Sequence, residues 1–559
     1  MDTVRFIYFL FYFILLWLIS NIIQCVTSDE IPLSKRLAGS QPNIVLIMAD
    51  DMGWGDIGAN WPNTRDTPFL DYFATISLRL PDYHSGASVC SVSRATLLTG
   101  RLPRRTGVWH NFDTTALGGL PTNETIIPEL LKTVGYTTAI HGKWHLGHLP
   151  PFHPSYRGFD EYIGIPYSID MGCTDNPGAN HPPVRPCPKD PAYTEINHEH
   201  PDDIRKIIQA DLTVGVPLYQ CLTPRCPNDN CNKDIIEQPV NLSTLTQSYI
   251  DNDRRFIQQS VDAKKPFFLY LPLSHMHVPH DYAQKFKNSS VEPSIYGDTL
   301  RELDHHVNQT YQLLQELNVL NQTLFIFTSD NGPWLTKCEL GGSPGPFLGI
   351  WQTEPVPYGG GGGSSAKLTT WEAGHRVPFL AHWPGMIKPG TISNAIASHL
   401  DMMPTIAKLA GFTLPSNRSY DGINLGPVLF DGSDQGHEFL FHPDSNGTLS
   451  AVRHNQYKAY YTTYGGDGAC GGRHGLTIDH EPPLIFDLSH DVAESTPIQP
   501  PQSVYDAIDQ ALQAKRSDIA STARTTVDYR TGGADARACC DAGHVVCRCT
   551  NNYGYPFHI

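Results

Sequence analysis

Positive charge is scarce in this sequence. Its 559 residues include 40 Lys and Arg against 56 Asp and Glu, a formal net charge of −16 at pH 7, and the basic residues form no run. Proteins that bind a nucleic acid backbone need clustered cations to neutralise phosphates, so we expect no nucleic acid partner. Charged residues are only 17% and hydrophobic residues 40%, which excludes a disordered tail, a coiled coil and a collagen-like fibre.

Long apolar runs are also absent beyond the N-terminus. The one such stretch, residues 6–19, follows the basic Arg5 and is then broken by polar residues. This layout is typical of a secretory signal peptide, predicted here over residues 1–28 with cleavage after Cys25 or Ser28. A signal anchor is the alternative, because the stretch is near the lower limit for crossing a bilayer. We therefore expect a secretory-pathway protein, lysosomal or extracellular, with no membrane span after signal cleavage.

Sequons and cysteines agree with an oxidising, secretory compartment. N-x-S/T sequons occur at Asn123, Asn241, Asn288, Asn308, Asn321, Asn417 and Asn446. The 13 cysteines include two clusters, Cys173, Cys187, Cys221, Cys226 and Cys231 in a Pro-rich stretch, and Cys539, Cys540, Cys547 and Cys549 at the C-terminus. We interpret both as loops held by disulfides. Zinc sites are the alternative, disfavoured because neither cluster has well-spaced histidines.

Buried strands alternate with helices over most of the chain. Continuous apolar runs at residues 43–49, 265–271 and 323–328 predict strands buried on both faces, and residues 125–134 and 300–317 predict helices. This alternation indicates an α/β fold with a large, mostly parallel, helix-covered sheet over residues 41–430. Shorter β-like segments at 451–453, 457–463 and 484–488 and a helix at 503–515 predict a smaller α+β domain over residues 431–559, ending in the cysteine-rich tail.

Polar residues follow the predicted strands at their carboxyl ends, where open parallel sheets bind ligands. Asp50 and Asp51 end the first strand, His275 and His277 follow the second, and Asp330-Asn331 ends the third. Oxygen donors without sulfur suit calcium or magnesium. Each pair alone could simply begin a turn, but two pairs that each close a buried strand favour a cation.

Cys90 precedes a helix predicted over residues 93–98 and ending at Gly100. Together with Arg94 one turn later, the helix start offers an anion-binding setting. A buried or disulfide-bonded cysteine is the alternative. The glycine run at 358–365 lacks the lysine and hydroxyl ending of a phosphate-binding loop, so we predict a mobile insertion near the site.

Four segments, in this order and spacing, resemble the sulfatase family. They are NIVLIMADDMGWGD (43–56), CSVSRATLLTGR (90–101), GKWHLG (142–147) and TSDNG (328–332), with further matches at 152–160 and 369–374. The likeness is to the branch that holds arylsulfatase A and N-acetylgalactosamine-6-sulfatase, and it extends from Pro42 to the C-terminal cysteines. It implies an alkaline-phosphatase-like sheet and an arylsulfatase-type sulfuric ester hydrolase acting on aryl sulfates, sulfated sugars or glycolipids.

The resemblance also implies the cofactors. The formylglycine-generating enzyme would be a partner during maturation and would oxidise Cys90 to formylglycine, whose aldehyde hydrate supplies an oxygen nucleophile. Its second hydroxyl expels sulfate without a second attack at sulfur. One calcium ion would be held by Asp50, Asp51, Asp330 and Asn331 together with residue 90, and would polarise both the sulfate and the nucleophile.

Roles of the remaining positions follow from the same resemblance. Arg94 and Lys143 would hold the hydrate, and His145 would be the base that releases sulfate. His277 would protonate the leaving alcohol, with His275 packed elsewhere, and this acid role predicts an activity maximum at acidic pH. The resemblance also implies that Lys367 and Ser168 contact sulfate oxygens. We further expect His480, before Glu481-Pro-Pro, to approach the substrate from the smaller domain, and Cys338 and Cys470 to form a disulfide that ties this domain to the large one. In isolation, Lys143 and Lys367 could be ordinary surface lysines.

One departure from the family pattern concerns Val92, because the maturation motif has proline or alanine two positions after the cysteine. Proline lacks an amide hydrogen and fixes φ, so valine presents a different conformation, and we predict slow or partial conversion of Cys90. A catalytically impaired relative that binds sulfated glycans is therefore the second hypothesis. A metal-dependent phosphohydrolase is the third, disfavoured by Cys90 and a single hard-cation site. A homo-oligomer is compatible with the sequence, which carries no signal of oligomeric state.

Overall fold

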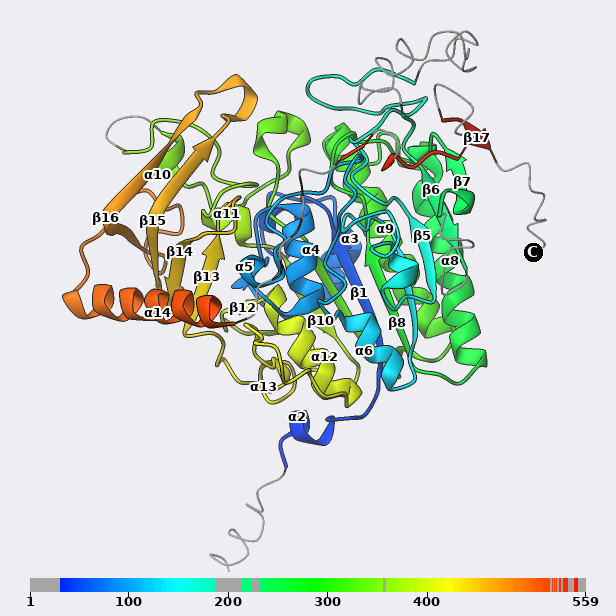
Figure 1. The fold of residues 1–559 in the computed structure, drawn as a ribbon, viewed down its shortest axis with the longest axis horizontal. Coiled ribbons are helices and arrows are strands. Elements are labelled where there is room, and N and C mark those ends of the chain that lie inside the picture. The colour runs from blue at the N-terminus through cyan, green and yellow to red at the C-terminus, as the bar shows by residue number, and fades with distance from the viewer. Residues whose placement is uncertain are drawn as a thin grey trace, which may run out of the picture.

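The structure is a computed structural model that describes residues 31–187, 214–222, 231–354 and 358–522, with residues 525, 527, 529, 532–533, 536–540 and 547–550 near the C-terminus. The predicted signal peptide and Cys226 lie outside the described residues. The described chain folds into one large helix-covered sheet and a separate, smaller antiparallel sheet, which lie beside each other in Figure 1. The predicted fold class is confirmed.

The large sheet is mixed, with five central parallel strands in the order β9-β1-β8-β4-β5. In full spatial order its described strands are β11 (Thr391–Ile392), β2 (Leu78–Arg79), β10 (Phe379–His382), β9 (Thr323–Ser329), β1 (Asn43–Ala49), β8 (Phe267–Pro272), β4 (Thr137–His141), β5 (Glu161–Gly164), β6 (Leu218–Cys221), β7 (Ile235–Gln238) and β17 (Cys549–Thr550). A further short pair joins β3 (Tyr83–His84) and β12 (Ala397–Ser398). Because β1 lies at the centre, both of its faces are buried.

Alternate side chains of β1 enter two different cores. Ile44, Leu46 and Met48 pack with helices α4 (Cys90–Thr99), α6 (Ile127–Thr133) and α12 (Met402–Ala410), whereas Val45 and Ile47 pack with α3 (Pro68–Ile76), α8 (Leu242–Asp262) and α9 (Ile295–Glu316). All five side chains are fully buried, and each such burial stabilises the fold by about 1.5–3 kcal/mol. The remaining described α-helices are α2 (Leu33–Arg36), α5 (Pro103–Thr106), α10 (Ile350–Thr353), α11 (Glu372–His375), α13 (Gly426–Phe430) and α14 (Gln502–Ser521).

Predicted elements differ from observed ones mainly at their ends. β1 has the predicted bounds, but α4 begins at Cys90 itself. It ends at Thr99 and is followed by the C-cap Gly100, whose φ of 67° is left-handed. α9 begins five residues earlier than predicted, because the Ser294 side chain accepts a hydrogen bond from the amide of Gly297 and so caps the helix. The helical period alone did not reveal that cap.

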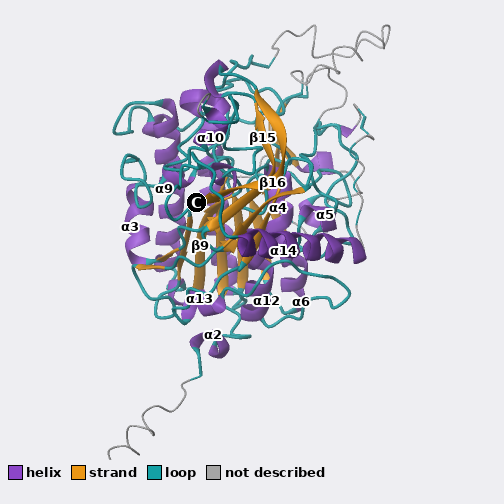
Figure 2. Ribbon diagram, turned by 90° about the vertical axis from the view of Figure 1, so that its left-hand side faces the viewer, coloured by secondary structure: helices purple, strands orange, loops and turns teal. Residues whose placement is uncertain are grey.

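The smaller sheet has the order β13 (Phe439–Pro443), β14 (Leu449–His454), β15 (Tyr457–Gly466) and β16 (Gly475–Asp487), with antiparallel neighbours. One face packs against α14 through Ile508 and Leu512, and Figures 1 and 2 show this helix lying across the strands. The opposite face packs on Trp351 and Trp371 of the large domain. The division of the chain at residue 430 stays a prediction.

Four disulfides join cysteines of the described residues: Cys173–Cys187, Cys338–Cys470, Cys539–Cys547 and Cys540–Cys549. The expected Cys338–Cys470 bridge is therefore present, and it connects the 3-10 helix η8 (Leu335–Leu340) with the region between β15 and β16. Of the predicted glycosylation sites, Asn123, Asn288, Asn321, Asn417 and Asn446 are exposed and the other two are half-buried.

The glycine run forms backbone hydrogen bonds with the small sheet, and its mobility stays a prediction. The amides of Gly363 and Ser364 donate hydrogen bonds to the carbonyls of Arg473 and Gly465 between and within the strands of the small sheet. A Cβ atom at Gly363 would lie only 2.2 Å from the Gly465 carbonyl oxygen and 2.6 Å from its carbonyl carbon, so only glycine allows this approach. The run therefore packs the large domain against the small one.

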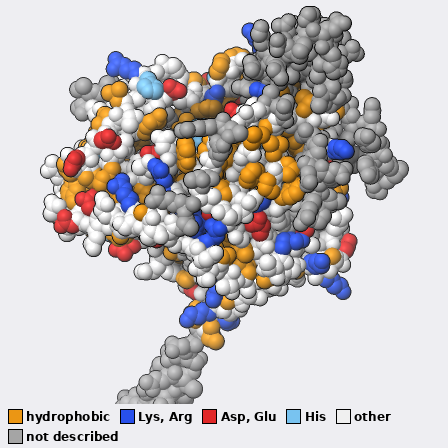
Figure 3. All heavy atoms as spheres, viewed as in Figure 1, with side chains coloured by type: hydrophobic (Ala, Val, Ile, Leu, Met, Phe, Trp, Pro, Cys, Tyr) orange, Lys and Arg blue, Asp and Glu red, His pale blue; other side chains and the backbone are white. Residues whose placement is uncertain are grey.

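No helix of the described chain is both long and apolar enough for a membrane crossing. On the face drawn in Figure 3, side chains of Lys and Arg are scattered among acidic and apolar ones.

Candidate functional site

Two parallel strands place the predicted oxygen ligands side by side. Ala49 of β1 pairs with Ser329 of β9, and the amide of Asp330 donates to the Ala49 carbonyl, so Asp50 and Asp330 emerge at adjacent positions. Asp51 adopts a φ of 58°, which turns the chain immediately after the strand. Asp50, Asp51, Asp330 and Asn331 are all at most 2% exposed. The register of a central parallel pair thus creates the acidic cluster.

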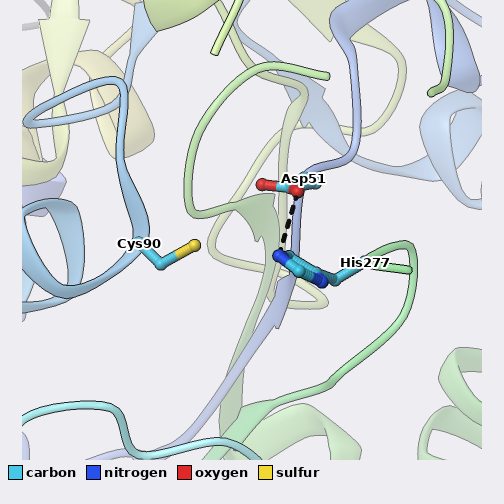
Figure 4. A group of neighbouring side chains, drawn as sticks. All are labelled: Asp51, Cys90 and His277. Atoms are coloured by element: carbon cyan, nitrogen blue, oxygen red, sulfur yellow. Dashed lines mark ion pairs between the residues drawn. The ribbon is translucent and has the colours of Figure 1, made fainter. Parts of the chain in front are cut away.

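Cys90 faces this cluster from the first turn of α4. Its Sγ lies 3.5 Å from Oδ1 of Asp50, and Figure 4 shows the sulfur directed toward Asp51 and His277. One ligand atom each of Asp50, Cys90 and Asp330 lies within 4.8 Å of the others, as does one each of Asp51, Cys90 and His277. Cys90 is fully buried and forms no disulfide.

Burial raises the pKa of the Cys90 thiol well above its usual range, although Lys143 and Lys367 oppose that effect. The thiolate is the nucleophilic form of cysteine. In the unmodified state this side chain would therefore be a poor nucleophile, despite its position at a helix N-terminus.

Each carboxylate of the cluster has its own cation. Nζ of Lys143 lies 2.6 Å from Asp50, Nζ of Lys367 lies 2.7 Å from Asp51, and Nη2 of Arg94 lies 2.8 Å from Asp330. The three cationic side chains are at most 5% exposed. Burial alone would favour their neutral forms, but the neighbouring carboxylates outweigh it and raise the pKa of Lys143, Lys367 and Arg94. All three remain charged at physiological pH and form a positive wall around Cys90.

The cluster fits a hard divalent cation. Three carboxylates converge with Asn331, whose Nδ2 donates to Asp51 at 2.7 Å while its buried Oδ1 has no hydrogen-bond partner. An unpartnered buried amide oxygen beside three carboxylates is a donor set that calcium prefers. Thiolate and imidazole ligands, which favour zinc, are not the majority among the side chains that converge here.

His145 is held in one tautomer. Its Nε2 lies 3.1 Å from the Phe112 carbonyl, which can only accept a hydrogen bond, so Nε2 carries the proton. Its buried Nδ1 has no partner and therefore presents a lone pair. Burial and the cations Lys143 and Arg94 lower the pKa of His145 well below its usual value, which keeps the ring neutral. A neutral imidazole with a free lone pair can accept a proton.

The two ring nitrogens of His277 have the opposite roles to those of His145. Its Nδ1 donates to the Val278 carbonyl at 2.6 Å, and its Nε2 lies 3.5 Å from Oδ2 of Asp51, the contact marked in Figure 4. Burial, followed by the charge of Lys367, lowers the pKa of His277 well below its usual value. His275 points elsewhere, with its Nε2 3.2 Å from Glu302, as expected for the other histidine of the pair.

Ser168 and His480 have different surroundings. Ser168 is buried and its Oγ accepts a hydrogen bond from Lys143 at 3.2 Å, which places it at the cluster. His480 on β16 instead contacts Oγ1 of Thr463 at 2.9 Å and packs on the Trp351 ring. No contact of the described chain joins His480 to the cluster, and its role in substrate binding stays a prediction.

Trp334 was missed in the sequence analysis. Its half-buried ring lies 5.3 Å from the His277 ring and 4.3 Å from Nζ of both Lys367 and Lys337. Its position only three residues after Asn331, at the carboxyl end of β9, was the available signal. Phe112 was also missed, because a backbone carbonyl leaves no trace in the residue types.

Comparisons with known proteins agree with this geometry. The family profile described as Sulfatase matches residues 42–412, and that described as C-terminal region of aryl-sulfatase matches residues 435–549. The chain is 45% identical to arylsulfatase G of Rattus norvegicus, covering 93% of this chain and 95% of the relative, and 37% identical to arylsulfatase A of Bos taurus, covering 85% and 87%. The crystal structure of PsFucS1 sulfatase from Pseudoalteromonas sp. is similar with a TM-score of 0.72 at 26% identity, covering 89% of this chain and 97% of that one.

Proposed function

The chain belongs to the sulfatase family and is a sulfuric ester hydrolase, and we propose that it cleaves aryl sulfates or sulfated sugars and glycolipids with a formylglycine made from Cys90 and one bound calcium ion. The observation that carries the proposal is the position of Cys90. This side chain is buried, unbridged and 3.5 Å from Asp50, and it is surrounded by three cations. A tetrahedral sulfate group, on whose oxygens negative charge accumulates during transfer, is the kind of group that such cations stabilise.

The formylglycine hydrate would supply the oxygen that attacks sulfur and the second hydroxyl that expels sulfate as the aldehyde reforms. The raised pKa of Cys90 supports the need for this conversion, because the thiol itself is not activated. The maturation partner would be the formylglycine-generating enzyme.

The chain's own side chains divide the remaining work. Arg94 and Lys143 orient the hydroxyls at position 90. The free Nδ1 of His145 accepts the proton when sulfate is expelled, and Nε2 of His277 donates a proton to the leaving alcohol oxygen. Lys367 and Ser168 hold sulfate oxygens, on which negative charge accumulates in the transition state.

Protonation of His277 must precede its role as an acid. Its Nδ1–H is already donated to Val278, so a proton on Nε2 makes the ring an imidazolium. The lowered pKa disfavours this form, and a bound sulfate anion would favour it. The requirement supports an activity maximum at acidic pH. It suits a lysosomal location reached through the secretory pathway, and an extracellular location is the alternative.

Calcium would be held by Asp50, Asp51, Asp330 and Asn331 with residue 90, and it would polarise the sulfate ester. The unpartnered Oδ1 of Asn331 supports this assignment.

The test is hydrolysis of a chromogenic aryl sulfate by the secreted protein, measured beside the corresponding phosphate ester over pH 4–9. We expect turnover of the sulfate only, a maximum below pH 7, and loss with EDTA that calcium reverses. Turnover of the phosphate alone would favour the phosphohydrolase, and a rate that is highest above pH 8 would contradict the role of His277.

Val92 motivates the second candidate, an impaired relative that binds sulfated glycans. It packs against Ala87 and Val89 at 1% exposure, in the first turn of α4. Glycan binding without any turnover by the protein from its native source would favour this candidate.

A further inference from the structure

His145, the base of the proposed reaction, is held in place by a separate loop rather than by a strand or helix of its own. His145 has a φ of 58°, a conformation that residues other than glycine adopt at an energetic cost, so surrounding contacts must maintain it. Two of these contacts come from elsewhere in the chain: Phe112 accepts from Nε2 at 3.1 Å, and Oγ of Ser91 donates to the His145 carbonyl at 2.7 Å.

The segment from Gly107 to Phe112, here called the base loop, connects the two sides of the site. Beside its contact with His145, it accepts a hydrogen bond from the amide of Ser91, the residue after Cys90, through Oδ1 of Asn111 at 2.9 Å. The Phe112 amide also donates to Oγ of Ser91 at 3.4 Å. A shift of the base loop would therefore displace His145 relative to position 90.

Tyr529, more than 400 residues away in the sequence, fixes the base loop. Its hydroxyl accepts from the Trp109 amide at 3.0 Å and donates to the Gly107 carbonyl at 3.3 Å. Its ring stacks on Phe112 with centroids 5.2 Å apart and planes inclined by 21°, and it packs on Trp109 at 4.9 Å. One side chain thus engages both ends of the loop.

Neighbouring described residues of the C-terminal tail also contact segments close to the base loop. The Thr525 amide donates to Arg105, Gly532 pairs with Ala116, and the Ala536 carbonyl lies 2.6 Å from Nε2 of His148. These described tail residues therefore contact the segments on both sides of the base loop, and Ala536 reaches His148, three residues beyond the base.

We propose that Tyr529 of the C-terminal tail is a positioning residue for His145, acting through the base loop. The inference rests on the proposed role of His145 as the proton acceptor. Tyr529 itself touches no reacting group. It holds Phe112 where its carbonyl keeps the proton on Nε2 of His145, so that Nδ1 retains its lone pair.

The test compares Tyr529→Ala and Tyr529→Phe with the wild-type full chain, each also combined with His145→Ala. General bases contribute roughly 10²–10⁴-fold. We expect Tyr529→Ala to lower kcat by about ten-fold or more with KM within about two-fold, and to shift the limb of the pH profile that reports the base. Tyr529→Phe keeps the ring stacked and should therefore lower kcat less than Tyr529→Ala does. In the His145→Ala background neither change should lower kcat further, because the interaction acts through His145.

Amide hydrogen exchange gives a second readout that is independent of turnover. Tyr529→Ala should speed exchange in the base loop, the Trp109 amide above all, since its acceptor is removed. Tyr461→Phe is the matched control, because Tyr461 also donates its hydroxyl within the C-terminal part, to Asp509, but lies outside the tail. The control should leave exchange in the base loop and kcat unchanged.

The inference would be overturned if Tyr529→Ala lowered kcat by the same factor in the wild-type and His145→Ala backgrounds. It would also be overturned if Tyr529→Ala left amide exchange in the base loop unchanged. If the wild-type protein hydrolyses no sulfate ester, the proposed function fails, and the exchange experiment still decides whether Tyr529 fixes the loop. If the wild type is active and all Tyr529 variants match it, only the inference about Tyr529 fails.

Discussion

At the scale of single residues, the site is a set of buried ion pairs in which each carboxylate lies against a cation. Asp50 pairs with Lys143, Asp51 with Lys367, and Asp330 with Arg94. Taking both charges of a buried pair out of water costs several kcal/mol per ion and can exceed their mutual attraction, so such pairs are poor choices for stability alone. Their arrangement around Cys90 makes sense when a divalent cation and a sulfate share the same space.

Lys367→Met tests the positive wall. The variant should lower kcat/KM for an aryl sulfate by about 10²–10³-fold, because one fixed donor to the developing charge is lost. Lys388→Met is the control, since Lys388 is exposed and away from the cluster. Steady-state rates of the two variants give the answer, and similar rates would contradict the role of Lys367.

Val92→Pro tests why conversion of Cys90 should be incomplete. Proline restores the family's maturation motif by removing the amide hydrogen and fixing φ. We expect a larger fraction of formylglycine at position 90 and a proportional rise in activity per mole of protein, as measured by peptide mass spectrometry beside the rate assay. An unchanged fraction would show that valine is not what limits conversion.

At the scale of elements, a buried network joins β4, β5, α8 and α9 behind the site. His141 lies 2.6 Å from Asp253 and 3.0 Å from Glu161, and His306 lies 2.9 Å from Asp253. Burial would lower the pKa of His141, but its hydrogen bonds to the two carboxylates outweigh this and raise the pKa to about 9. The network fixes the strand that leads directly to Lys143 and His145.

This raised pKa predicts a pH dependence of stability. A folded pKa of about 9 against 6.5 means that His141 stabilises the fold fully below about pH 6.5, and that this contribution is lost as pH rises through 9. His141→Gln should therefore lower the free energy of unfolding by up to about 3 kcal/mol more at pH 6 than at pH 10. Urea unfolding at both pH values measures it, and an equal loss at both would contradict the charged state of His141.

The elements were predictable where burial leaves a pattern along the chain. The apolar run 43–49 gave β1 its bounds, and the polar residues after β1 and β9 located the cluster. The short strands β2, β10 and β11 were missed because two to four residues carry no periodic signal. Trp334, Phe112 and Tyr529 were missed for another reason: their contacts depend on how distant loops meet, which no local pattern encodes.

At the scale of the whole molecule, the small sheet is fixed to the large domain by covalent and polar contacts. Cys338–Cys470 closes a loop with a sequence separation of 132, and buried Arg105 bonds Asp421 and, on α14, Asp518. The glycine run adds backbone hydrogen bonds between the same two parts. Such a fixed arrangement keeps β15 and β16 beside the loop that carries Lys367.

Removal of this disulfide should destabilise the protein more than removal of a shorter one. The double variant Cys338→Ser with Cys470→Ser should lose about 2–5 kcal/mol, because a long loop regains much entropy in the unfolded chain. Cys173→Ser with Cys187→Ser is the control, with a separation of only 14. Denaturant unfolding of both proteins tests the order, and a larger loss in the control would contradict the account.

The proposed mechanism depends most directly on the chemical state of residue 90. Mass spectrometry of the peptide spanning this position, from protein secreted by its native source, measures that state. We expect at least part of the material to carry the formylglycine aldehyde in place of the thiol. Material with only an unmodified thiol at Cys90 would contradict the proposed mechanism.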